Sequence, residues 1–143
     1  MRRNLLVVAL GIGFLILITW LGTLVTTFVR PRVTAPVQTA QAGPYQITLQ
    51  VNPNPPSITQ PAALSVQVLS RTTQQPVTNA RVTLESNMET MDMGTDQENA
   101  RAQGDGTYLA SVQFTMSGPW QIQVIVAVPG TQPASTVFEV STQ

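Results

Sequence analysis

The first feature that limits the fold is a long uncharged segment near the N-terminus. No residue from Asn4 to Val29 carries a charge. As an α-helix, Leu5 to Val29 would be roughly 37 Å long, which exceeds the roughly 30 Å hydrocarbon core of a bilayer. The sequence therefore predicts a transmembrane anchor over residues 1–30. About 100 residues remain, enough for a single domain with its own core.

A cleaved signal peptide is the competing interpretation of this segment. Arg2 and Arg3 form a basic start, and Ala40-Gln41-Ala42 resembles a small-residue cleavage site. The apolar part of a signal peptide is only about 7 to 15 residues long, so an uncleaved anchor is favoured. Because the C-terminal domain is rich in Gln, Thr and Pro and poor in basic residues, we expect it to be extracytoplasmic. The N-terminus of this single-pass membrane protein is then cytoplasmic.

Small and hydroxylated residues gather on one face of the outer half of the predicted helix, namely Thr19, Gly22, Thr23, Thr26 and Thr27. Such a face lets helices approach closely, which favours docking to another membrane protein or a homo-oligomer formed through the helix. Alternatively, the Thr hydroxyls bond to carbonyls of their own helix and face lipid. The sequence leaves both alternatives open.

Proline marks the change from anchor to domain. Residues 31–44 contain Pro31, Pro36 and Pro44, and their apolar residues do not recur at the spacing of a helix or a strand. This composition predicts an extended tether. From residue 45 onward, apolar and polar residues alternate in short runs separated by turn-forming residues, as half-buried strands do. The pattern predicts an all-β domain over residues 45–143. We expect an immunoglobulin-like antiparallel β-sandwich preceded by one N-terminal transmembrane helix.

Two of the clearest strand patterns lie close together in the sequence. Tyr108 to Met116 and Trp120 to Val128 both alternate, and Ser117-Gly118-Pro119 separates them. We interpret the two runs as a hairpin with a three-residue loop. Trp120, at the start of the second run, is expected to fill the core.

Composition argues against several classes of function. The chain has no Lys, Cys or His, and after Arg32 it carries three Arg against seven acidic residues, a net charge of minus four. Nucleic-acid binding would need clustered basic residues, so no nucleic-acid partner is expected. Without Cys, His or Lys, the usual pairs of nucleophile and base cannot be assembled, so we do not expect an enzyme.

Methionine is the soft metal donor that this composition retains. Four of the five methionines lie in the predicted domain, at Met88, Met91, Met93 and Met116. Neutral thioethers suit copper(I), so these residues form a candidate copper(I) site, to which Glu89 and Asp92 add negative potential. Packing is the competing interpretation, because Met fills irregular gaps in cores and Met116 is close in sequence to Trp120.

A set of short motifs occurs in the order typical of a known family. They comprise Pro76-Val77 with Ala80 and Val82, then Met88, Met91 and Met93-Gly94, then Gly106 and Tyr108, and finally Phe114, Met116, Gly118 and Trp120. Over roughly residues 45–128 the chain resembles the YtkA-like domain family. The resemblance implies a small extracytoplasmic β-sandwich, often anchored by one helix. FixH-type relatives are associated with assembly of copper-containing respiratory oxidases, and the related CopC-like sandwiches bind copper.

Two functions fit this sequence. The first is a membrane-anchored accessory domain that binds copper(I) through its methionines, for delivery to or assembly of a membrane metalloenzyme such as a respiratory one. The second is a structural or assembly subunit that docks to a membrane complex without binding metal. Both imply the lipid bilayer and a membrane protein complex as partners.

Overall fold

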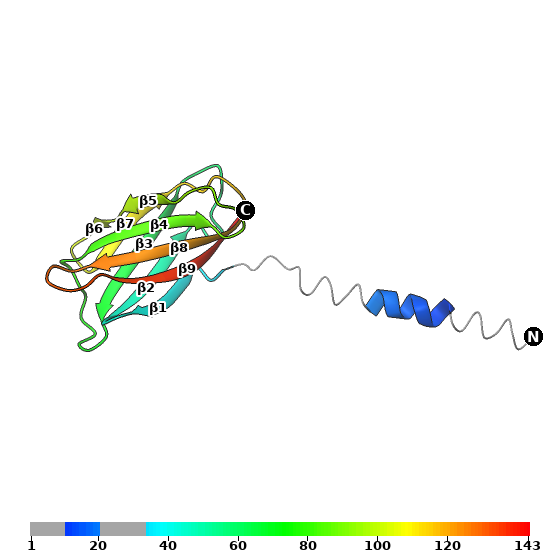
Figure 1. The fold of residues 1–143 in the computed structure, drawn as a ribbon, viewed down its shortest axis with the longest axis horizontal. Helices are drawn as coiled ribbons and strands as arrows, with labels where there is room; N and C mark the ends of the chain where they lie inside the picture. Colours follow the sequence, from blue (N-terminus) through cyan, green and yellow to red (C-terminus); the bar gives the residue numbers. More distant parts are fainter. Residues whose placement is uncertain (1–10, 21–33) are drawn as a thin grey trace, which may run out of the picture. The chain divides into compact units, whose positions relative to one another are not determined.

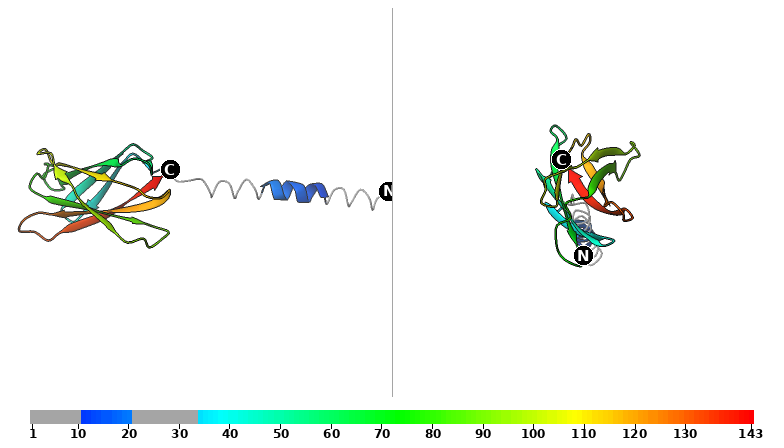
Figure 2. Two further views of the ribbon diagram at one scale, coloured as in Figure 1. Left: turned by 90° about the horizontal axis from the view of Figure 1, so that it is seen from above. Right: turned by 90° about the vertical axis from the view of Figure 1, so that its left-hand side faces the viewer.

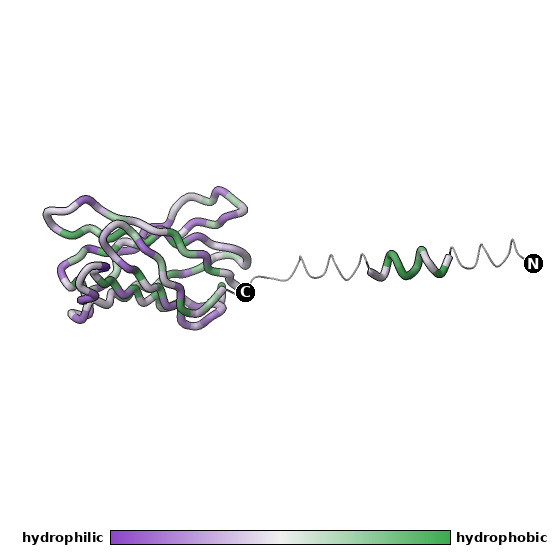
Figure 3. Tube along the Cα trace, turned by 90° about the horizontal axis from the view of Figure 1, so that it is seen from below, coloured by the Kyte–Doolittle hydropathy of each residue, from purple (hydrophilic) through white to green (hydrophobic). Residues whose placement is uncertain are grey.

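The computed structural model describes residues 11–20 and 34–143. The chain divides into two units, Met1–Arg32 and Val33–Gln143. In the first unit, residues 11–20 are α-helical and strongly apolar (Figure 3). Among the described residues, no helix reaches the length and hydropathy of a membrane span. Most of the expected anchor, residues 1–10 and 21–30, lies outside the described residues.

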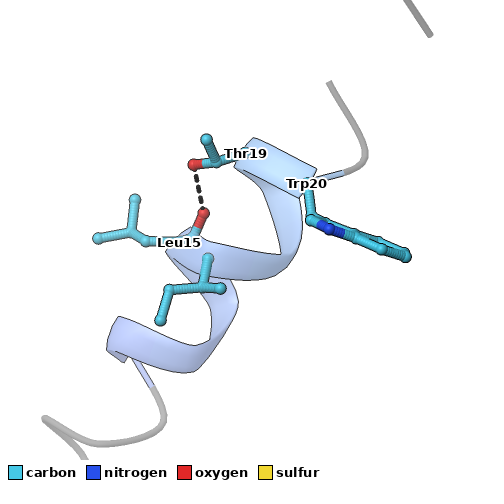
Figure 4. Close-up of a pocket in the computed structure, with 4 residues that line it drawn as sticks. Leu15, Thr19 and Trp20 are labelled. Atoms are coloured by element: carbon cyan, nitrogen blue, oxygen red, sulfur yellow. Dashed lines mark hydrogen bonds between the residues drawn. The ribbon is translucent and has the colours of Figure 1, made fainter. Parts of the chain in front are cut away.

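One residue of the hydroxyl-bearing face falls within the described helix. Thr19 Oγ1 donates a hydrogen bond to the carbonyl oxygen of Leu15, one turn earlier, at 2.8 Å (Figure 4). This is the bond expected where a Thr hydroxyl satisfies itself within its own helix. The rest of that face, Gly22, Thr23, Thr26 and Thr27, lies outside the described residues.

In residues 34–143, nine strands build two antiparallel sheets that pack face to face (Figures 1 and 2). Sheet A has the order β1 (Val37–Ala42), β2 (Tyr45–Asn52), β3 (Ala62–Ser70), β7 (Thr107–Val112) and β6 (Arg101–Ala102). Sheet B has the order β5 (Asp96–Asn99), β4 (Arg81–Met88), β8 (Gly118–Ala127) and β9 (Ala134–Thr142). The predicted β-sandwich is confirmed.

The core lies between the two sheets and follows from the alternation in each strand. On β8, Trp120, Ile122 and Val124 are buried, whereas Gln121 on the other face is exposed. Complete burial of an aliphatic side chain stabilises a fold by about 1.5–3 kcal/mol. The apolar faces of β2, β3, β4, β7, β8 and β9 therefore supply the cohesion of a domain that contains no cysteine.

The folded unit begins earlier than the sequence predicts. Val37–Ala42 belong to the expected tether, residues 31–44, yet they form β1 and pair along β2. The inward positions of β1 are Gln38, Ala40 and Ala42, which are polar or small. Because these side chains produce no apolar alternation, the strand was not recognised. The prediction of an extended tether over this stretch was wrong, and the sandwich starts before Tyr45.

The prediction of a hairpin between Tyr108 and Val128 was also wrong. β7 pairs with β3 and β6 in sheet A, whereas β8 lies between β4 and β9 in sheet B. Between them the chain crosses from one sheet to the other, with Phe114 fully buried on the way. The Phe114 ring packs edge-on against Trp120, with centroids 5.3 Å apart. Alternation shows which face of a strand is buried, but it does not identify the neighbouring strand.

Candidate metal centre

The four methionines of the predicted site all belong to one end of the sandwich. β4 ends at Met88, which pairs with Trp120 near the start of β8. Met91 and Met93 lie in the loop that joins β4 to β5, and Met116 precedes β8 by two residues. We call this part of the molecule, residues 88–95 and 114–120, the methionine end.

Met88 is a core residue. Its side chain is 7% exposed and lies opposite Trp120 across the two strands. A Cβ atom built on Gly118 would come within 2.9 Å of the terminal methyl carbon of Met88, so the glycine leaves just enough room for this side chain. The packing interpretation accounts for Met88, because its thioether can reach a metal ion only by leaving this contact.

Met116 occupies an intermediate position on the connection between the sheets. Its side chain is partly buried and packs against the edge of the core. Its carbonyl oxygen accepts hydrogen bonds from Trp120 Nε1 at 3.0 Å and from Thr142 Oγ1 at 2.7 Å. These bonds fix the backbone of Met116 and satisfy the indole N–H of the buried tryptophan. The expectation that Trp120 fills the core is confirmed.

Met91 and Met93 are accessible from solvent, with exposed fractions of 50% and 55%. Their loop is tied to β8 at its first residue, where Glu89 N donates to the carbonyl oxygen of Pro119 at 3.1 Å. It turns at Gly94, whose φ is 85° and whose N–H donates to Asp92 Oδ1 at 3.3 Å. A glycine suits this positive φ, which side chains disfavour. The loop therefore presents two thioether side chains outside the core.

Acidic residues are interspersed with the exposed methionines in the sequence. Glu89 and Asp92 are exposed in the loop, and Asp96 follows at the start of β5. In residues 11–20 and 34–143, no three or more His, Cys, Asp or Glu side chains are grouped so that they could hold a metal ion. The acids near Met91 and Met93 thus supply negative potential, which raises the local concentration of cations, without forming an oxygen-rich ligand set.

The structure adds two residues that the sequence did not suggest. At the methionine end, the Thr142 hydroxyl donates a hydrogen bond to the carbonyl oxygen of Met116 at 2.7 Å. The same hydroxyl accepts a hydrogen bond from Gly118 N at 3.0 Å. Asn87 carries a buried amide oxygen that has no hydrogen-bond partner among the described residues. Neither residue has a sequence signal, because Thr and Asn are common on strands and turns and their partners are set by the tertiary fold.

Comparison with known proteins bears on the folded unit. The family described as YtkA-like matches residues 39–125, which is more than half of the chain. The matched stretch runs from β1 into β8 and includes Met88, Met91, Met93 and Met116. The curated proteins contain no match to this chain.

Proposed function

The chain belongs to the YtkA-like family, and from this premise we propose that it is an extracytoplasmic accessory domain that binds copper(I) through methionine. Residues 1–30 would hold it at the membrane, where it delivers the ion to a membrane metalloenzyme or helps to assemble one. The observation that carries the proposal is the exposure of Met91 and Met93 on an acidic loop, in a protein without Cys or His. Neither delivery nor assembly requires the chain to be an enzyme.

The chemistry of the loop suits a transiently held ion. Thioether sulfur is a soft, neutral donor that selects copper(I) over hard cations, and a pair of such donors holds the ion weakly enough to release it. Met91 and Met93 are the primary ligands in this proposal. Met116, which is partly buried at the same end, is the candidate third ligand. Met88 would join only if its contact with Gly118 opened.

The strand order supports a finer assignment of the fold. Sheet A places β3 beside β7, and sheet B places β8 between β4 and β9. This matches the arrangement in which strands B and E share one sheet of an immunoglobulin-like sandwich while C, F and G share the other. The same type of sandwich is implied by the resemblance to CopC-like and FixH-type proteins, which associates the family with copper.

A second candidate function is a structural or assembly subunit that binds no metal. It is favoured by the outer face of sheet A, where Thr39, Thr48, Gln67 and Thr107 lie opposite one another across four strands. The centres of protein–protein interfaces are depleted in charged residues, and this row has none. The burial of Met88 is also explained without a metal.

Copper(I) titration separates the two functions. The folded unit, residues 34–143, is titrated anaerobically against a copper(I) chelator as competitor. We expect one ion to be retained by the wild-type unit and lost in the double variant Met91→Leu with Met93→Leu. Met88→Leu is the matched control and should retain the ion, because Leu nearly conserves the volume of Met. If the wild-type unit takes up no copper(I), the first function is excluded and the structural or assembly function is favoured. If the double variant takes up as much as the wild type, the ligands lie elsewhere.

A further inference from the structure

Sheet B has two edge strands, β9 and β5, and they differ in what lies beside them. On β9, the carbonyl oxygen of Glu139 accepts a hydrogen bond from Gln38 Nε2 at 2.6 Å, and Ser141 N donates to Thr34 Oγ1 at 3.1 Å. In residues 34–143, β5 has β4 as its single neighbouring strand, and all of its residues are exposed. Figure 1 shows β5 at the margin of the sandwich. The open edge of sheet B is therefore β5.

The pairing with β4 determines which backbone groups of β5 are free. Just after β5, Ala100 N donates to the carbonyl oxygen of Val82 at 2.9 Å. Because hydrogen-bonded residues alternate along an antiparallel pair, the even-numbered residues of β5 bond to β4. The odd-numbered residues, Gln97 and Asn99, direct their N–H and C=O groups away from β4. Such unpaired groups can bond to an additional strand.

The side chains of Asp96 and Glu98 lie on the inner face of sheet B. Asp96 is opposite Ser86 and Glu98 is opposite Leu84, and both of these β4 residues are buried in the sandwich. Residues that are directly opposite in a strand pair have their side chains on the same face of the sheet. The carboxylates of β5 are nevertheless exposed, because this strand lies at the margin of the sheet.

A groove of about 280 Å³ lies beside these carboxylates, and we call it the β5 groove. Asp96 and Glu98 line it from sheet B, and residues 111–113 line it from the end of β7 and the connection that follows. A second groove, of about 400 Å³, shares Glu98 and Ser111 with the first and also contains Arg101. Among the residues that line the β5 groove, two are acidic and none is basic, so this groove favours positively charged groups.

We propose that β5 binds an extended segment of a partner protein that carries Lys or Arg at alternate positions. The segment adds to sheet B as an antiparallel strand and bonds to the main chain of Gln97 and Asn99. Its residues opposite Asp96 and Glu98 then form non-hydrogen-bonded pairs, in which side chains are closest. Their basic groups enter the β5 groove beside the two carboxylates. Opposite charges in such positions stabilise a strand pair.

Charge distinguishes this occupant from other strands. A second copy of β5 would bring its own Asp96 and Glu98 next to those already there, and like charges directly opposite one another are destabilising. An apolar strand would cover the two carboxylates without pairing them, which is costly. Inward-pointing charges on an edge strand protect it from both kinds of pairing. A basic segment avoids both penalties because it supplies the missing counter-charges.

A partner at β5 would also be close to the exposed methionines. Met93 lies three residues before Asp96, a stretch that reaches at most about 11 Å. Docking at β5 does not require copper(I), so it is compatible with both the delivery function and the assembly function.

Peptide binding to the full chain, purified in a nonionic detergent, tests the docking site. The probe is a fluorescent peptide of Val and Thr with Lys at its second and fourth positions. One control peptide has Glu at both positions. The other keeps Lys but is N-methylated at its odd positions, so it retains the charges and loses the donors that face β5. In anisotropy titrations we expect the probe to bind saturably at concentrations up to about 1 mM, and both controls to bind at least about tenfold more weakly.

Two pairs of variants locate the bound peptide. Gln97→Pro removes an N–H that points away from β4, whereas the matched control Gln97→Ala keeps it. We expect the first to weaken binding about fivefold and the second less than about twofold. Glu98→Gln removes a charge from the β5 groove and should weaken binding about threefold. Glu85→Gln, which removes a charge from the outer face of β4, is its control and should have less effect.

Hydrogen exchange of the wild-type chain gives a measurement that needs no variant. Addition of the probe should slow exchange at the Gln97 and Asn99 amides, while that of Glu98, which bonds to β4, should change little. No binding of the probe, or equal binding of the probe and either control peptide, would overturn the docking proposal and leave the copper(I) proposal intact. Dimerisation of the chain that is lost in Gln97→Pro would show that a second copy occupies this edge, and would also overturn it.

Discussion

Met88 lies directly opposite Trp120 in the β4–β8 pair, so one of the four candidate ligands forms part of the core. Met91, three residues later, is half exposed on the loop that follows. The same residue type is therefore part of the core at Met88 and accessible to solvent three residues later. Packing at Met88 holds the end of β4 against β8, and that contact sets the position from which the exposed methionines project.

Replacing Met88 and Met93 by Ala, one at a time, should show the difference between a buried and an exposed methionine in the stability of the domain. Met88→Ala leaves a cavity beside Gly118 and Trp120, and we expect it to lower the free energy of unfolding by about 2–5 kcal/mol. Met93→Ala removes a side chain from solvent and should change it by less than about 0.5 kcal/mol. Urea denaturation of residues 34–143 measures both. Similar losses in the two variants would show that the loop methionine also packs.

Gly106 and Gly104 form a matched pair for testing the close approach of Gly106 to Pro76. Both have positive φ, 82° and 92°, so Ala is strained at either position. At Gly106 the added Cβ would also lie 2.5 Å from Pro76 Cβ, whereas at Gly104 no atom lies within 4 Å. We expect Gly106→Ala to be less stable than Gly104→Ala by about 1–3 kcal/mol. Thermal denaturation checks this, and equal midpoints would contradict it.

The hydroxyl of Tyr108 fixes the approach to β4. It donates to the carbonyl oxygen of Val77 at 2.8 Å and accepts from Ala80 N at 3.1 Å. Tyr108→Phe leaves both backbone groups without this partner, so we expect a loss of about 1–3 kcal/mol. In the control Tyr45→Phe, the lost contact is one 3.4 Å pair with Thr131 Oγ1, and the loss should be below about 1 kcal/mol. Chemical denaturation should rank the variants in this order, and the reverse order would argue against the role of Tyr108.

We expect Asp105 to make the stability of the domain depend on pH in the acid range. The pKa of its carboxyl group is lowered, first by the hydrogen bond from the backbone N–H of Thr107 and then by the Thr107 side chain. Because the folded pKa lies below the unfolded value of about 3.9, the contribution is complete above that value. It is lost as the pH falls through the folded pKa.

Asp105→Asn should therefore be less stable than the wild type at pH 7, and the gap should close as the pH falls below about 4. Thermal midpoints between pH 7 and pH 2 measure this gap. Glu98→Gln, on the exposed strand β5, controls for the removal of one negative charge. A gap between wild type and Asp105→Asn that stays constant over this range would contradict the role assigned to the carboxylate.

Much of the sandwich could be predicted because alternation is a local property. The alternating runs Tyr108 to Met116 and Trp120 to Val128 predicted strands where β7 and β8 lie, and Trp120 was expected in the core. The sequence does not predict β1, because its inward side chains are not strongly apolar. They are Gln38, Ala40 and Ala42. The four candidate ligands were chosen from composition, since Met is the soft donor that the chain retains. Composition cannot assign burial to each of them.

The sequence by itself determined that a long apolar segment is followed by short runs in which apolar and polar residues alternate. It therefore predicted a candidate anchor followed by a β-sandwich. The tertiary structure alone decided that β7 and β8 lie in different sheets, that Thr142 bonds to Met116 across 26 residues, and that Met88 is buried while Met91 and Met93 are exposed. The physical reason is that a strand's alternation depends on its own side chains. Its neighbours, and the burial of each side chain, depend on contacts with segments that are distant in the chain.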